Sequence, residues 1–174
     1  MSRISKVAKL MTYITQGSIG LLLIAFAYIW SDKTIRTEAL SNYLIGIDQT
    51  NISTQSLLGG FILSAVLFGV LIYGLYQCLQ FFKLYRNNEI FPEKSGVYLS
   101  NFGMALFLLS PATILIRSIS SILFSLQKPQ GQYQLIVSIE GTDLLIIIVG
   151  GLIFMVGHIL NIARSVAEEN KQII

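Results

Sequence analysis

The polar residues best suited to chemistry lie near the C-terminus, at the end of a long apolar stretch. His158, the only histidine, is followed by Asn161, Ser165, Glu168 and Glu169. Because a helix turns by about 100° per residue, these side chains share an arc of roughly 100° on one face. Ionisable groups inside a membrane mark pathways or partners. The stripe therefore predicts either a proton relay or cation route, or a structural hydrogen-bonding role for His158.

A second candidate is Arg117, which lies within another apolar stretch. A charge at the bilayer centre costs about 2.5–3.5 kcal/mol on insertion scales. Counted along a helix from Leu99, however, Arg117 lies roughly 27 Å away, near the far interface, where a long side chain can reach water. Two interpretations follow: an interfacial arginine, or an outward cationic pocket in which Arg117 pairs with Glu140 or Asp143.

Other chemistries lack the residues they need. There is no glycine-rich phosphate loop, no supported Ser/His/Asp arrangement and no buried carboxylate pair, so we expect no enzyme. A lone histidine and a single cysteine, Cys78, make a poor metal site, and no cofactor is predicted. The net charge of +3 does not indicate nucleic acid, because the cationic residues flank the apolar stretches.

The elements that must position these residues are four apolar runs, at about 13–30, 57–82, 99–126 and 144–162. About 20 helical residues cross a hydrocarbon core about 30 Å thick, and each run supplies enough length. The composition agrees, with 53% hydrophobic and 12% charged residues. We predict an all-α integral membrane protein, a four-helix transmembrane bundle that forms one domain over residues 1–174 and contacts the lipid bilayer.

Orientation follows from the lysines and arginines between the runs. Eight lie before the first run, between the second and third, and after the fourth, whereas three lie in the other two gaps. Short loops rich in these residues stay in the cytoplasm. Both termini are therefore predicted inside, in a bacterial cytoplasmic (inner) membrane. The sequence around Ala25 and Ala27 resembles a signal cleavage site, but the apolar run continues to Trp30, so the first span is expected to be retained.

The third run is unusual because it contains Pro111. A proline removes one backbone hydrogen bond and kinks a helix, and Ser110 and Thr113 are placed to relieve the defect. After Arg117 the pattern becomes amphipathic, with serines on one face. The span either tilts and continues, or ends near Arg117 and is followed by a short interfacial helix.

Two regions could contact other proteins. The second run contains small residues at four-residue spacings, Gly60 with Ser64 and Ala65 with Gly69, which suit packing inside the bundle or a homo-oligomer. The inner loop places Tyr85, Arg86, Glu89 and Phe91 close together. These four residues suit either the headgroup zone or the docking of a cytoplasmic or membrane protein partner.

Three segments carry a family resemblance. Residues 82–91 (FKLYRNNEIF), 99–103 (LSNFG) and 160–174 (LNIARSVAEENKQII) resemble the small bacterial membrane proteins of domain of unknown function 2975. That family shows a G-E-x-F turn, an L-R-x-x-G opening and a closing segment containing E-E. Here Asn88 stands in place of the turn glycine and Ser100 in place of the common arginine.

The resemblance implies no established activity. Some members are encoded beside a small helix-turn-helix regulator, which implies signalling or a stress response rather than metabolism. We therefore predict a regulatory or accessory membrane protein that acts through protein contacts. The alternative is a small oligomeric channel or transporter with a polar path along the fourth helix. A third hypothesis is the binding of a lipid or apolar peptide between helices.

Overall fold

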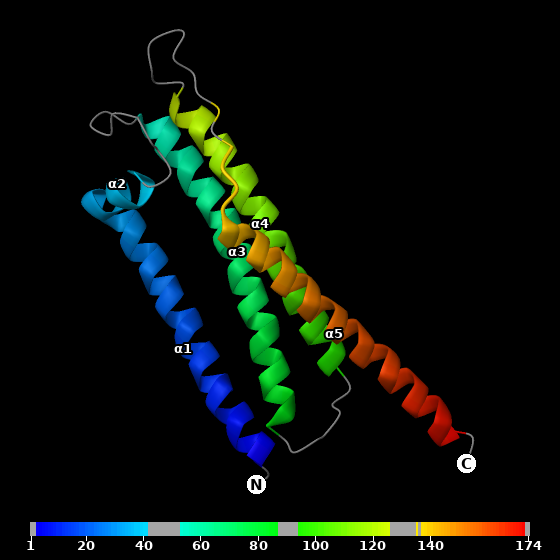
Figure 1. Cartoon of the computed structure of the whole chain (residues 1–174). Helices are drawn as coiled ribbons and strands as arrows, with labels where there is room; N and C mark the ends of the chain where they lie inside the picture. Colours follow the sequence, from blue (N-terminus) through cyan, green and yellow to red (C-terminus); the bar gives the residue numbers. More distant parts are fainter. Residues whose placement is uncertain (1–2, 42–52, 87–93, 126–134, 136, 173–174) are drawn as a thin grey trace.

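The computed structural model describes residues 3–41, 53–86, 94–125, 135 and 137–172, and not the side chains of 39–41, 124 and 167–172. The described part is helical apart from a few residues next to the helices (Figure 1). The helices are α1 (Arg3–Ser31), α2 (Lys33–Ser41), α3 (Thr54–Tyr85), α4 (Ser95–Ser125) and α5 (Gly141–Gln172).

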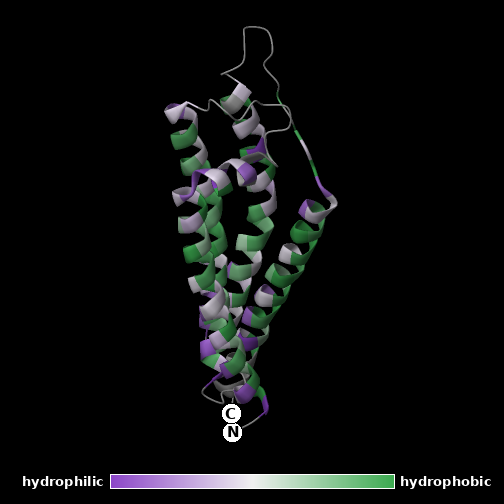
Figure 2. Cartoon of the chain, turned by 90° about the vertical axis from the view of Figure 1, so that its left-hand side faces the viewer, coloured by the Kyte–Doolittle hydropathy of each residue, from purple (hydrophilic) through white to green (hydrophobic). Residues whose placement is uncertain are grey.

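Four of these helices, α1, α3, α4 and α5, are long and apolar enough to cross a membrane. Only 11% of the most apolar window of each helix is buried inside the protein, so most apolar side chains face outward. Figure 2 shows this distribution, with hydrophobic residues along the helix bodies. Side chains that are apolar and unburied suit a hydrocarbon solvent, and the prediction of four membrane-spanning helices is thereby supported in length and composition.

The helices pack mainly with their neighbours in the chain: α1 with α3, α3 with α4, and α4 with α5. The closest packing joins α4 and α5, where glycines let the two backbones meet. A Cβ atom on Gly150 would lie 2.5 Å from the backbone nitrogen of Phe107, and one on Gly103 would collide with the backbone of Phe154. Without a hydrophobic effect between helices in lipid, such close backbone contact is the main source of association.

The pairing of α1 with α3 changes along its length. Near the N-terminus, small buried side chains form a stripe on α1 at Ser5, Ala8, Thr12 and Thr15. The Ser5 hydroxyl donates to the carbonyl of Arg86 at the end of α3, 2.9 Å away. Beyond Thr15 the buried stripe ends, and Figure 1 shows the two helices separating toward the C-terminal end of α1.

The third run forms one helix. α4 continues through Pro111 and past Arg117 to Ser125, so the alternative of a separate interfacial helix after Arg117 is wrong. The reason lies in which face is buried: Ser121 and Ser125 are almost fully buried, whereas Ile119 and Ile122 face outward. An interfacial helix would bury its apolar residues and expose its serines to water. Buried small residues and outward-facing branched apolar residues instead suit a helix surrounded by lipid.

The two hydroxyls beside Pro111 act differently from one another. Thr113 donates to the carbonyl of Leu109 within α4, at 2.8 Å, and not to the Phe107 carbonyl that Pro111 leaves without its helical partner. Ser110 instead donates to the carbonyl of Asp143 at the start of α5, at 2.9 Å. Ser110 therefore joins two helices and does not repair its own.

The short helix α2 falls in the predicted outer loop, where we expected no helix. Asp32 starts it: its carboxylate accepts from the backbone amides of Thr34 and Ile35, at 2.8 and 3.2 Å. An aspartate at this position satisfies amides that have no partner inside the helix. Figure 1 shows α2 turned across the end of α1.

Candidate functional site

The strongest candidate site is a cavity of about 340 Å³ among α1, α3 and α4, with one residue from α2. This volume lies at the lower end of the roughly 300–1,000 Å³ typical of small-molecule pockets. Its lining is mostly apolar, with a few hydroxyls and two arginines. The lining residues are Phe26, Ile29, Trp30, Arg36, Gly60, Ser64, Leu67, Phe68, Leu71, Leu109, Thr113, Ile116, Arg117 and Ser120.

Aromatic residues of α1 and α3 meet one another at the cavity, and two small residues of α3 also line it. Phe26 stacks on Phe68 with ring centroids 4.4 Å apart, and Trp30 meets Phe61 edge-on at 5.0 Å. These rings form the contact between the C-terminal part of α1 and α3. On α3, Gly60 and Ser64 also line the cavity and carry little or no side chain. Their spacing was predicted to serve helix packing, and it also leaves space at the cavity wall.

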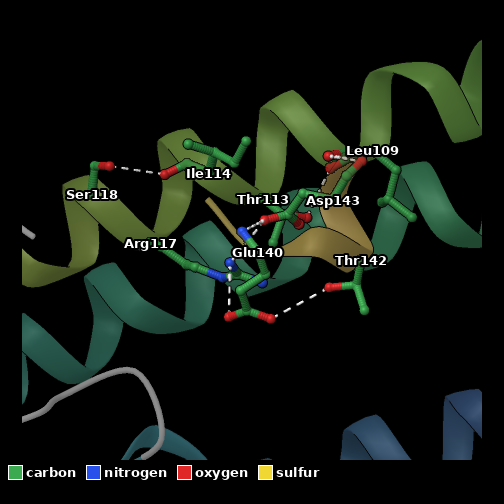
Figure 3. A network of polar contacts seen from close by, with 9 residues as sticks. Leu109, Thr113, Ile114, Arg117, Ser118, Glu140, Thr142 and Asp143 are labelled. Atoms are coloured by element: carbon green, nitrogen blue, oxygen red, sulfur yellow. Dashed lines mark hydrogen bonds and ion pairs between the residues drawn. The ribbon is translucent and has the colours of Figure 1, made fainter. Parts of the chain in front are cut away.

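Arg117 forms an ion-pair network at one end of the cavity (Figure 3). One terminal nitrogen lies 3.1 Å from a carboxylate oxygen of Glu140 and 3.1 Å from one of Asp143. The predicted pairing is thus confirmed, and it involves both carboxylates. The Asp143 side chain is 4% exposed and that of Glu140 is 55% exposed, so Asp143 is the buried member.

Asp143 also organises the start of α5. Its carboxylate accepts from the backbone amide of Glu140, 2.9 Å away, while the amide of Asp143 donates to the Glu140 carbonyl at 3.0 Å. The side-chain bond is one half of a capping box, and it places an acidic residue in the positive first turn of the helix. The same side chain therefore fixes the helix end and holds the Arg117 guanidinium in place.

Arg36 reaches the cavity from α2. Its backbone amide bonds to the carbonyl of Asp32, and one terminal nitrogen donates to the carbonyl of Trp30 at 3.0 Å. Its Nε atom is buried and has no hydrogen-bond partner among the described residues, and the same is true of Nε of Arg117. Two arginines from different helices thus line one cavity, and each has a buried donor without a partner among the described residues.

The predicted polar stripe on α5 lies elsewhere. His158 is exposed on the surface of the chain, with its ring nearly parallel to that of Phe154 at 6.4 Å. Asn161 is half-buried, with its amide oxygen against Gly96 of α4. Glu168 and Glu169 lie on α5, but their side chains are outside the described residues. His158 is 15 residues from Asp143 along α5, or about 22 Å, so the structure does not bring the stripe and Arg117 together.

Of the four predicted docking residues, the structure describes Tyr85 and Arg86. Tyr85 is half-buried and lines an open cavity of about 360 Å³ with Arg3 and Phe82, between the start of α1 and the end of α3. Arg86 is exposed, and its carbonyl accepts from Ser5. Glu89 and Phe91 lie outside the described residues.

Comparison with known proteins identifies the family of this chain. The family model for a protein of unknown function (DUF2975) matches residues 47–174. The chain belongs to the DUF2975 family. Searches of curated proteins and of solved structures gave no significant match.

The DUF2975 match covers α3, α4 and α5, and it begins after α1 and α2. Arg117 and its carboxylate partners therefore lie inside the matched part, whereas Trp30 and Arg36 precede it. The sequence did not lead us to predict that Phe26 and Trp30 line a cavity, or that Arg36 reaches it. Asp32 was the available signal, because an aspartate after a helical run is typical of a new helix start.

Proposed function

We propose that this DUF2975 protein is a regulatory or accessory membrane protein, not an enzyme, which binds one small amphiphile between α1, α3 and α4. The observation that carries the proposal is the 340 Å³ cavity. Its wall is apolar with few polar groups at one end, the composition typical of small-molecule sites. Helix packing supports the same choice, because Gly60 and Ser64 of α3 line the cavity beside the aromatic rings and carry too little side chain to fill it.

The charge distribution supports a setting for this function. With both termini inside a bacterial cytoplasmic membrane, Arg36 and Arg117 belong to the outer half of the molecule. Tyr85 and Arg86 then belong to the inner side, with the loop that follows them. We propose that the protein acts on a protein partner there. Ligand occupancy would change how α1 rests on α3, because the cavity lies where these helices separate.

The alternative of a channel or transporter along α5 draws less support from the contacts. Its key residue, His158, faces away from the other helices of the same chain. A polar path through that residue therefore requires a second copy to cover it. Saturable ion or proton flux in liposomes would favour the channel over the accessory function.

The single tryptophan of the chain offers a direct test, because Trp30 lines the cavity. We would reconstitute the protein in nanodiscs and titrate a single-chain amphiphile brominated on its acyl chain. Bromine quenches tryptophan emission on contact, so binding in the cavity predicts a saturable quench above the linear background from the bilayer.

The matched variants are Ser64→Phe and Ser18→Phe. Both serines donate to a carbonyl of their own helix, but only Ser64 lines the cavity. A phenylalanine at position 64 fills the space, and we expect the saturable quench to disappear in that variant alone. A quench that stays linear in the unmodified protein would contradict the proposal, as would equal loss in both variants.

A further inference from the structure

We propose that the cavity selects an amphiphile with an anionic phosphate or carboxylate head, and that Arg36 of α2 is the residue that binds this head. This inference rests on the proposed function and extends it from an apolar ligand to a charged class. Four observations carry it: the placement of Arg36, the lack of an ion pair between Arg36 and any described carboxylate, the buried donors of both arginines that have no partner among the described residues, and the division of the cavity into a polar end and an apolar body.

The placement of Arg36 is fixed by the turn between α1 and α2. Asp32 caps α2, and Arg36 follows one turn later, with its backbone amide on the Asp32 carbonyl at 3.0 Å. Its guanidinium folds back over the end of α1 and donates to Trp30. A bond to a neutral carbonyl holds the group in position without cancelling its charge.

The missing counter-ion distinguishes Arg36 from Arg117. Arg117 faces two carboxylates, at 3.1 Å each. In the part of the chain that the structure describes, no carboxylate forms an ion pair with Arg36. A partly buried charge without a counter-ion is unfavourable, and an incoming anion would relieve it. The positive charge that attracts a ligand therefore comes from Arg36.

Both arginines also carry a donor without a partner among the described residues. Nε of Arg36 and Nε of Arg117 are both buried without a partner among the described residues. Leaving a buried charged donor unsatisfied carries a desolvation cost that an oxygen acceptor removes. Guanidinium groups suit carboxylate and phosphate oxygens especially well, because their donors lie in a planar fork. Both guanidinium groups line the cavity, but only Arg36 lacks an ion pair with a described carboxylate.

The rest of the cavity is apolar, so a small anion without an acyl chain does not suit it. Phe68, Leu71 and Leu109 line it farther along α3 and α4, and no counter-charge accompanies them. A free phosphate would leave these walls uncovered, whereas an acyl chain would fill them. The class is therefore a single-chain lipid with an acidic head, which either the membrane or a free fatty acid could supply.

The experiment compares three brominated amphiphiles with the same acyl chain, using Trp30 quenching in nanodiscs of neutral lipid. The heads are a carboxylate (fatty acid), a phosphate (lysophosphatidic acid) and an uncharged glycerol (monoacylglycerol). We expect at least one acidic head to bind about tenfold more tightly than the glycerol, as expected for a charge-assisted bond. Tighter binding of the carboxylate indicates a free fatty acid as the source, and tighter binding of the phosphate indicates a membrane lipid.

Variants then assign the preference to Arg36. In Arg36→Gln the acidic and neutral ligands should bind alike, with the neutral affinity unchanged. Arg36→Lys should keep part of the preference, because it keeps the charge but loses the fork. Lys33→Gln, on the exposed side of the same helix, should behave as the unmodified protein.

Several outcomes would overturn the inference while leaving the proposed function intact: equal binding of all three ligands, or an Arg36→Gln variant that weakens them equally. A loss of preference in Lys33→Gln as large as in Arg36→Gln would also overturn it, because general surface charge would then explain the selection. Failure of all three ligands to give a saturable quench would instead reject both the inference and the proposed function.

Discussion

Asp143 combines two tasks that are usually separate. It caps α5 through the amide of Glu140, and it holds the guanidinium of Arg117. Glu140 touches the same guanidinium but is largely open. Burial decides which of these carboxylates matters, because a buried charge left without its partner is far costlier than an exposed one. The network should therefore depend strongly on Asp143 and weakly on Glu140.

The substitution Asp143→Asn tests this asymmetry. It leaves Arg117 with only the exposed carboxylate and weakens the cap, so we expect the free energy of unfolding to fall by about 3–5 kcal/mol. Glu140→Gln is the matched control, and it should cost less than about 1 kcal/mol. Both values can be measured by denaturant titration in detergent micelles. Equal losses in the two variants would show that burial does not govern the network.

At the residue scale, the sequence predicted the pairing of Arg117 but not the role of Arg36. Arg117 could be paired because the next polar segment offers only two carboxylates, Glu140 and Asp143. The position of Arg36 depends on the turn at Asp32, which folds α2 back on α1. His158 illustrates a different limit. A periodic pattern shows that residues share a face, but it does not reveal which face the neighbouring helix covers.

At the scale of the elements, length and apolar composition were enough to find the four long helices, because they reflect the solvent. Length and composition do not predict the register between two helices, that is, which of their residues meet. The contact of α4 with α5 depends on glycines seven residues apart, Gly96 and Gly103 on one helix and Gly150 and Gly157 on the other. Glycines are frequent in membrane helices, so their spacing alone could not show which of them meet.

A pair of glycine substitutions tests that register. In Gly103→Ala the new methyl group would collide with the backbone of Phe154, whereas in Gly69→Ala it would meet nothing within 4 Å. Both changes improve helix propensity by about 1 kcal/mol. Only Gly103→Ala also overpacks the contact between α4 and α5. Overpacking typically costs about 1–3 kcal/mol, and it costs that much or more when the neighbouring atoms belong to the backbone.

We therefore expect Gly103→Ala to lower the unfolding free energy and Gly69→Ala to leave it unchanged or raise it slightly. Disulfide formation between cysteines placed on α4 and α5 would give an independent measure of their approach. If Gly103→Ala were as stable as Gly69→Ala, with cross-linking unchanged, the close contact of the two helices would be wrong.

At the scale of the whole molecule, α4 and α5 form the tightly joined pair and α1 is the most loosely held of the long helices. Its small-residue stripe ends at Thr15, and its C-terminal part contacts α3 through aromatic rings. The cavity lies at this loose contact. Its function then depends on which side of the membrane it faces, because that side determines which lipids and solutes can reach Arg36.

Orientation can be tested without altering any charge that determines it. Cys78 is the only cysteine, so Cys78→Ser gives a background for single substitutions. Thr34→Cys lies on α2 beside the cavity end, and Ser2→Cys and Asn170→Cys lie near the termini. The lysine and arginine distribution predicts that a membrane-impermeant maleimide labels only Thr34→Cys in intact cells. All three should react after permeabilisation, which controls for accessibility. Labelling of Ser2→Cys or Asn170→Cys in intact cells would invert the arrangement. Arg36 would then face the cytoplasm, and the acidic lipid it selects would have to come from the inner leaflet.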